Sequence, residues 1–246
     1  MTPLSNLKLM LPEHLERLVP AIRRGLPFGI PALDALLPSG VPRGQITALD
    51  APLGSGGTAL LLALAETTLR ADEGVALVDA MRTLAPQAAA HLSALGQFWV
   101  IRPRGTESAW WCADVLLRTG AFGLVIVDQA PAPARKVAVR LQRLARDKDC
   151  ALVVRDAGTP LRDATRTPDY GATARLRVGA SADGFVPALP GSGAAWPGPR
   201  TVRVTTLKGG APRAAEVELG VVLPHRLRPH WAVRDRRAYG RRAGPR

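Results

Sequence analysis

The sequence predicts an α/β fold in which helices flank a mostly parallel sheet on both faces. Two observations support this prediction. Short apolar segments without polar alternation, such as 122–128 and 150–154, take turns along the chain with segments of helical character, and strands that are apolar on both faces are typical of a covered parallel sheet. In addition, a glycine-rich loop lies between the first strand and the first long helix, as it does in phosphate-binding loops.

The alternating core defines the expected elements and their order. A short helix at 29–38 precedes it. The strands are expected at 46–49, 75–78, 98–101, 122–128 and 150–154, and the helices at 59–69, 87–95, 107–118 and 134–146. We expect one core domain over residues 26–224, with an N-terminal helical segment, 1–25, and a C-terminal tail, 225–246.

Beyond residue 155 the pattern changes to that of antiparallel strands and loops. Residues 173–178 alternate like an edge strand, and 201–222 predict a β-hairpin with a turn at 208–212. Between them, residues 181–200 carry Gly and Pro at many positions, which predicts a mobile loop.

The N-terminal segment contains one apolar stripe. Its members share the spacing i, i+3, i+4 and i+7 and are Leu15, Leu18, Val19 and Ile22. This spacing predicts one face of a helix, interrupted by Pro20. The stripe either packs on its own domain or docks on a partner protein.

The charge of the chain is strongly basic, with a net charge of +13 and 33 Lys and Arg residues, of which only four are lysines. Such an excess favours an anionic partner, with nucleic acid first, although a GC-rich genome also encodes chains rich in arginine. Arginine is densest in the tail. The candidate contacts to DNA or to a partner there are Arg226, Arg228, Trp231, Arg234, Arg236, Arg237, Tyr239, Arg241 and Arg242.

Two interpretations of this tail remain open. Arginine forks suit phosphate groups and aromatic rings stack on bases, which favours nucleic acid. A solvated basic end, or a peptide that docks on an acidic partner, fits the same composition.

The remaining composition excludes several function classes. Cys112 and Cys150 have no metal-binding spacing and are expected to be small buried hydrophobes in a reducing compartment. The histidines have no clustered carboxylate or cysteine partners, so no metal site is expected. No signal peptide or long apolar run is present, so the protein is expected to be cytoplasmic and nucleoid-associated, with no membrane partner.

The helix expected at 107–118 carries Trp110 and Trp111 side by side. Adjacent helical residues point about 100° apart, so one tryptophan is expected in the core and the other at the surface, where it would suit a protein interface. The alternative is that both rings pack.

The glycine-rich loop departs from the phosphate-binding pattern G-x-x-x-x-G-K-[ST]. Ala51 stands at the first glycine and Gly57 at the lysine, whereas Gly56 and Thr58 are retained. The lysine places a positive charge on the terminal phosphates, so catalysis by this loop is not expected. The residues 54–58, which are Gly54, Ser55, Gly56, Gly57 and Thr58, form either a residual anion nest or a structural turn.

Four segments resemble RecA-type recombinases in order and spacing: GIPALDALLP with GVPRGQITALDAPLGSGGTALLLALA, ALVDAMRTLAP, AFGLVIVDQA and CALVVRD. The resemblance implies a RecA-like core. It also identifies the losses: Met81 replaces the glutamate that activates water, and Arg155 and Asp156 replace the γ-phosphate sensor. Asp128 keeps the carboxylate that supports Mg²⁺, and is expected to be satisfied by Ser55 or Thr58. The first DNA-binding loop of the family is missing after Asp128.

A RecA-like chain of this size with such losses and a basic end resembles the ImuA family. The resemblance implies a non-catalytic adaptor in SOS-induced mutagenesis and translesion synthesis, without a cofactor. Its partners would be RecA, an inactive Y-family polymerase homologue (ImuB-like) and the error-prone polymerase complex, with DNA reached through the basic tail. Two alternatives remain: a switch that binds ATP–Mg²⁺ weakly, and a weak DNA-dependent ATPase whose lysine comes from Lys136 or Lys208.

Overall fold

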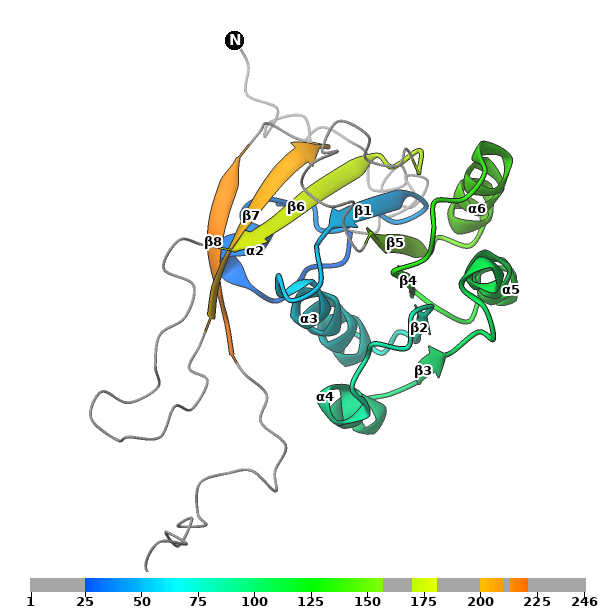
Figure 1. The fold of residues 1–246 in the computed structure, drawn as a ribbon, viewed down its shortest axis with the longest axis horizontal. Helices are drawn as coiled ribbons and strands as arrows, with labels where there is room; N and C mark the ends of the chain where they lie inside the picture. Colours follow the sequence, from blue (N-terminus) through cyan, green and yellow to red (C-terminus); the bar gives the residue numbers. More distant parts are fainter. Residues whose placement is uncertain (1–24, 157–169, 181–199, 210–212, 221–246) are drawn as a thin grey trace, which may run out of the picture.

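An eight-stranded sheet organises the protein, in the strand order β3-β2-β4-β5-β1-β6-β7-β8 (Figure 1). The computed structural model describes residues 25–156, 170–180, 200–209 and 213–220. The expected N-terminal stripe, residues 181–199 of the loop expected at 181–200, and the basic tail lie outside these residues, whereas Arg200 is already part of a strand. The α/β prediction is confirmed, because the sheet is mostly parallel and helices cover both of its faces.

The strands of the parallel part are short and mostly buried on both faces. The eight strands are β1 (Ile46–Asp50), β2 (Val75–Asp79), β3 (Phe98–Ile101), β4 (Leu124–Asp128), β5 (Ala151–Asp156), β6 (Ala174–Ala180), β7 (Arg200–Lys208) and β8 (Ala214–Leu219). In β1, β2 and β4 every residue is buried, which explains why their sequences show no polar alternation.

The helices and 3₁₀ turns connect these strands. They are α2 (Pro31–Asp34), α3 (Gly57–Arg70), α4 (Pro86–Ala89), η2 (Ala90–Ala94), η3 (Thr106–Ser108), α5 (Ala109–Thr119) and α6 (Arg135–Asp147). Helix α6 begins seven residues after the end of β4, so the connection after Asp128 is short, in line with the missing loop that the resemblance implies.

Strand β6 is not the edge strand that its alternation predicts. It pairs with β1 in parallel and with β7 antiparallel, and the β7–β8 hairpin extends the sheet beyond it. Its alternation has a different cause: Leu176 and Val178 are buried while Arg177 is exposed. The edges of the described sheet are β3 and β8.

Three expected helices are shorter than their patterns predict. The first is limited to Pro31–Asp34. It ends in a turn in which Leu36 N donates a hydrogen bond to the carbonyl oxygen of Leu33, three residues earlier (3.0 Å). The segment 87–95 divides into α4 and η2, and its 3₁₀ part brings Leu92 fully into the core. The helix expected from residue 107 starts as the 3₁₀ turn η3, a common helix beginning.

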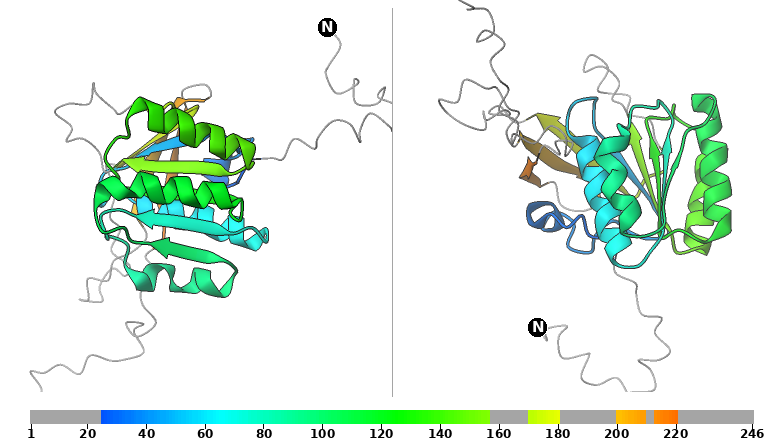
Figure 2. Two further views of the ribbon diagram at one scale, coloured as in Figure 1. Left: turned by 90° about the vertical axis from the view of Figure 1, so that its right-hand side faces the viewer. Right: turned by 90° about the horizontal axis from the view of Figure 1, so that it is seen from below.

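Each face of the sheet has its own hydrophobic core. One core lies beneath α3 and α4, and the other beneath α5 and α6, which lie side by side on the opposite face (Figure 2). Cys150 belongs to the second core, where burial raises the pKa of its thiol to about 12, whereas Cys112 is half-buried. Among the described helices, none is long and apolar enough to cross a bilayer.

Candidate functional site

The glycine-rich loop joins the carboxyl end of β1 to the start of α3. Gly54 (φ 77°) and Gly56 (φ 97°) adopt the left-handed conformation, which glycine enters without steric cost. Gly56 is the N-cap residue of α3, and no side-chain hydrogen bond caps this end of the helix. The sequence prediction of strand, loop and helix is therefore confirmed at this place.

A buried arginine lies against this loop. Arg155, at the carboxyl end of β5, is 2% exposed. Its Nη1 donates to Thr58 Oγ1 (2.8 Å) and its Nη2 to Asp128 Oδ2 (2.9 Å), while its Nε donates to Asp128 Oδ1. The pair is bidentate and desolvated, the geometry in which an Arg–carboxylate pair is strongest. Asp128 is thus held by Arg155, and not by Ser55 or Thr58 as expected.

The replaced lysine position has no room for a side chain. A Cβ atom added to Gly57 would lie 2.5 Å from Ala51 Cβ, 3.0 Å from Arg155 Cδ and 3.1 Å from Arg155 Nη1. The two departures from the phosphate-loop pattern are therefore sterically linked: alanine at 51 requires glycine at 57. Arg155 also occupies the space beside residue 57 from which a lysine would extend.

The β7–β8 hairpin covers the loop from the other side. A Cβ atom at Gly56 would lie 2.5 Å from Leu219 Cδ1 and 3.2 Å from Val202 Cγ1. Arg200 Nη1 donates a hydrogen bond to the Gly54 carbonyl oxygen. The hairpin, on the β6 side of β1 in Figure 1, therefore packs directly on the phosphate-loop backbone.

The hydrogen bonds inside the loop are those of a turn. Ser55 N donates to the Pro52 carbonyl oxygen (3.0 Å), so this amide is directed into the loop itself. The Ser55 hydroxyl is buried and has no hydrogen-bond partner among the described residues. A terminal phosphate and its Mg²⁺ would need Thr58 Oγ1 and the Asp128 carboxylate, and Arg155 already binds both.

The other strand ends on this edge carry matched charges. Asp79 is fully buried and accepts hydrogen bonds from Thr83 N (2.9 Å), Leu84 N (3.2 Å) and Arg102 Nε (3.1 Å). Met81, two residues on, is 53% exposed and supplies no acid or base. Asp79 therefore closes a turn and binds an arginine.

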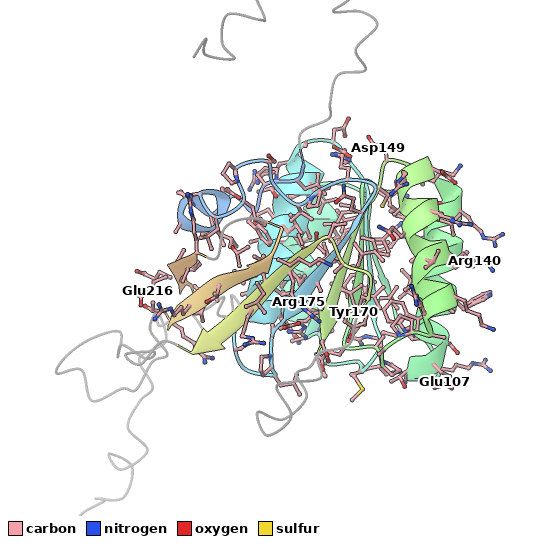
Figure 3. All side chains as sticks on the ribbon, turned by 90° about the horizontal axis from the view of Figure 1, so that it is seen from above. Glu107, Arg140, Asp149, Tyr170, Arg175 and Glu216 are labelled. Atoms are coloured by element: carbon pink, nitrogen blue, oxygen red, sulfur yellow. The ribbon has the colours of Figure 1, made fainter. Side chains whose placement is uncertain are left out.

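A further pair links β1 to β6. Arg175 Nε donates to Asp50 Oδ1 (3.2 Å), and Arg177 Nη2 lies 3.8 Å from Asp50 Oδ2. Figure 3 shows Arg175 beside Tyr170 at this end of the sheet. Burial raises the pKa of Asp50, and the two arginines oppose that shift.

Burial likewise raises the pKa of Asp128, and Arg155 opposes the shift. Asp79, on the next strand, adds to the rise because it is a second carboxylate in register with Asp128. The pairing with Arg155 therefore favours the charged form of this desolvated carboxylate.

The two tryptophans separate as their angular spacing predicts. Trp110 is 8% exposed, donates from Nε1 to the Pro131 carbonyl oxygen (2.7 Å) and packs against Tyr170 with ring centroids 6.1 Å apart. Trp111 is 69% exposed. The alternative in which both rings pack is wrong, because Trp111 points away from the core that holds Trp110.

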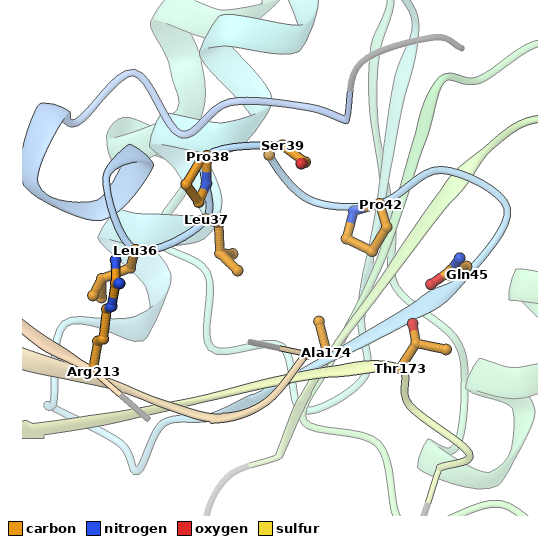
Figure 4. Close-up of a pocket in the computed structure, with 11 residues that line it drawn as sticks. Leu36, Leu37, Pro38, Ser39, Pro42, Gln45, Thr173, Ala174 and Arg213 are labelled. Carbon is orange, nitrogen blue, oxygen red and sulfur yellow. The ribbon is translucent and has the colours of Figure 1, made fainter. Parts of the chain in front are cut away.

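A cavity of about 390 Å³ lies at the opposite edge of the sheet, where β1 and β6 begin (Figure 4). Leu36, Leu37, Pro38 and Pro42 make its apolar wall, and Arg213 stands at one end. It holds none of the predicted site residues. Within the described parts of the chain, no three His, Cys, Asp or Glu side chains gather as metal ligands would.

Sequence reasoning missed the role of Arg155, which it treated only as a lost sensor. A usable signal was present: LVIVD and ALVVRD are neighbouring parallel strands, and Asp128 and Arg155 are register partners at their carboxyl ends. Opposite charges at paired ends of buried strands predict an ion pair. The contacts of Leu219 and Arg200 with the loop could not be predicted from the sequence, because the hairpin is distant from the loop along the chain.

Comparison with known proteins places these features in a family. The RecA N-terminal domain family matches residues 22–157, more than half of the chain. Protein RecA of Streptomyces coelicolor is 35% identical over 109 residues, which are 44% of this chain and 29% of that protein. The mitochondrial DNA repair protein recA homolog of Dictyostelium discoideum is 33% identical over 116 residues, 46% of this chain and 26% of that protein.

The chain thus matches less than a third of the length of these curated relatives. Among solved structures, the crystal structure of the RadB recombinase superposes with a TM-score of 0.56 and 21% identity, covering 78% of this chain and 94% of that chain. This likeness concerns the fold and extends beyond the part matched in sequence.

Proposed function

This chain belongs to the RecA N-terminal domain family, and we propose that within the family it is a non-catalytic adaptor in bacterial SOS-induced mutagenesis and translesion DNA synthesis. One observation carries the proposal. The Arg155 guanidinium binds both Thr58 and Asp128, the groups that would support the terminal phosphate and Mg²⁺.

Two further features of the same edge support the absence of catalysis. Gly57 supplies no lysine, and the contact with Ala51 leaves no space for one. Met81 supplies no general base. Restoring one of these groups would leave the others missing, so a single reversion is expected to leave the protein inactive.

The proposed partners are RecA and an inactive, ImuB-like Y-family polymerase homologue within an error-prone polymerase complex. The relation to RecA and to DNA repair proteins supports this setting, and the resemblance to the ImuA family supplies the specific partners. An adaptor needs a stable scaffold and accessible surfaces rather than a turnover site. A glycine-rich loop whose Thr58 is bound by Arg155, on an intact RecA-like core, is consistent with that need.

Calorimetry with ATP–Mg²⁺, followed by a phosphate-release assay on the same sample, tests the proposal. We expect neither binding at millimolar nucleotide nor release above background. The informative variant is A51G/G57K/R155N, which makes room for the lysine and frees Asp128. It is expected to bind ATP–Mg²⁺ without turnover, because Met81 still lacks a basic group.

The matched control is A51G alone, which alters the loop but keeps Arg155 in place, and it is expected to behave like the natural chain. Binding without release by the natural chain would favour a nucleotide-dependent switch, and release would indicate an ATPase. Pull-down of purified RecA and of the polymerase homologue tests the partners separately. Failure of both to bind would reject the adaptor role whatever the nucleotide result.

A further inference from the structure

The outer face of α6 carries a concentration of positive charge. Its 13 residues include five cations, Arg135, Lys136, Arg140, Arg143 and Arg146, and one acid, Asp147. Ala138, Leu141 and Ala145 face the core. At 100° per residue, all five cations lie within an arc of about 140° on the opposite side, along about 16 Å of helix.

Four of these cations have no carboxylate partner among the described residues. Arg135, Lys136, Arg143 and Arg146 are all exposed, and the ion pairs of α6 involve only Arg140, whose Nε lies 2.7 Å from Asp114 Oδ1 on α5. Figure 3 shows Arg140 pointing outward from the helix pair. We call Arg135, Lys136, Arg143 and Arg146 the α6 basic face.

The stability of the helix does not explain the two cations at its amino end. Arg135 and Lys136 occupy the first turn, which holds no acidic residue, and Ala134 before it provides no side-chain cap. The amino end of a helix is partially positive, so cations there are unfavourable. A local arrangement that costs stability without a structural gain points to a binding role.

An exposed aromatic ring lies on the neighbouring helix α5, on the side that reaches Arg140 of α6. Asp114, which binds Arg140, lies one turn after Trp111 on α5, so the 69% exposed Trp111 ring lies on the same side of α5. Exposed cations with an accessible aromatic ring are the arrangement used for single-stranded nucleic acid, in which phosphates bind the cations and a base stacks on the ring.

We infer that the α6 basic face, together with Trp111, is a docking surface for single-stranded nucleic acid. It lies on α6, away from the glycine-rich loop that joins β1 to α3. The surface goes beyond the adaptor role proposed above and does not depend on it, because phosphate contacts on α6 require neither nucleotide nor a protein partner.

The test measures fluorescence anisotropy of a labelled 20-nucleotide single strand with the full chain, between 50 and 300 mM salt. The variant is R135Q/K136Q/R143Q/R146Q. We expect at least a tenfold loss of affinity at about 100 mM salt, and a salt slope smaller by about 3, the value for four lost phosphate contacts on a single strand. Circular dichroism checks that the variant is folded.

The matched control is R104Q/R203Q/K208Q/R213Q, which removes four other exposed cations and changes the net charge equally. It is expected to lose less than about threefold, since charge elsewhere acts only through the general field. Equal losses in the two variants would overturn the inference, and so would an unchanged salt slope in the α6 variant.

Two further measurements separate the alternatives. W111A is expected to weaken single-strand binding about tenfold and to leave a duplex of equal length unaffected; no loss on the single strand would overturn the inferred partner. Vesicles containing phosphatidylserine are expected to bind the natural chain and the α6 variant equally. A loss confined to vesicles would instead indicate a membrane surface, and a loss confined to RecA or the polymerase homologue a protein interface.

Discussion

Arginine has opposite surroundings in two regions of this protein. At the carboxyl edge of the sheet, buried strand-end carboxylates are each matched by an arginine: Asp79 by Arg102, Asp128 by Arg155, and Asp50 by Arg175. On the outer face of α6, four exposed cations have no such partner among the described residues. The net charge of +13 therefore says little about where an anion binds.

The difference follows from solvation. A charge buried at the sheet edge costs several kcal/mol unless an opposite charge and hydrogen bonds compensate it, so each buried carboxylate there needs its arginine. A charge on the surface of α6 keeps its water and needs no partner in the free protein. An arginine paired with a buried carboxylate is not available to bind an anionic ligand, whereas an exposed arginine without such a pair is.

The largest expected effect is at the buried pair. R155M leaves Asp128 desolvated and without its two strongest hydrogen bonds, so we expect the free energy of unfolding to fall by about 3–5 kcal/mol in urea denaturation. R143M on α6 breaks no ion pair or hydrogen bond among the described residues, and it is expected to change the free energy of unfolding by less than about 0.5 kcal/mol.

The double variant R155M/D128L separates charge from packing. With both charges removed, most of the stability is expected to return, because an apolar pair of similar volume needs no compensation. If the double variant were as unstable as R155M, the loss would arise from packing around β4 and β5. The difference in stability loss between R155M and R143M would then not arise from charge.

The next effect concerns the linked positions in the loop. G57A forces a Cβ atom to within 2.5 Å of Ala51 Cβ, and we expect a loss of about 1–3 kcal/mol from overpacking. A51G/G57A removes that contact and should recover part of the loss, as measured by urea denaturation of all three chains. Equal stability of G57A and the natural chain would contradict the steric link.

Much of the fold could be predicted from the sequence, and the reason is physical. Strands such as 75–79 and 124–128 are buried on both faces, so their apolar runs predict them directly. The edge position assigned to 173–178 was wrong, because alternation records the burial of one face and carries no information about which strand lies beside it. The 3₁₀ turn at η2 and the shortness of α2 depend on local turns that composition does not distinguish from helix.

The site was predicted only in part. Gly57 and Met81 identify lost groups by comparison with a motif, and the structure places the loop where that motif predicts. What fills the space was not predicted, because Arg155 and Leu219 reach the loop from 97 or more residues away. The α6 basic face was missed for a different reason: its arginines are diluted among the many others in the chain, and only burial and pairing distinguish them.

The smallest expected effect concerns α6. Here the test is whether reversing the charge of its cations raises or lowers the free energy of unfolding. R135E/K136E places acids at the positive end of the helix and should raise the free energy of unfolding by about 1 kcal/mol at low salt. R146E, at the opposite end of the same helix, is the matched control and should lower it by a few tenths of a kcal/mol. Urea denaturation measures both differences, and both should shrink in 0.5 M salt as the charges are screened.

Both variants should also weaken binding to the single strand, since each reverses charge on the same face. A substitution that stabilises the fold while it weakens binding is the outcome expected for residues retained for a partner rather than for folding. If R135E/K136E instead destabilised the protein, Arg135 and Lys136 would have a structural role. The four cations of the α6 basic face would then no longer differ in kind from the matched arginines at the sheet edge.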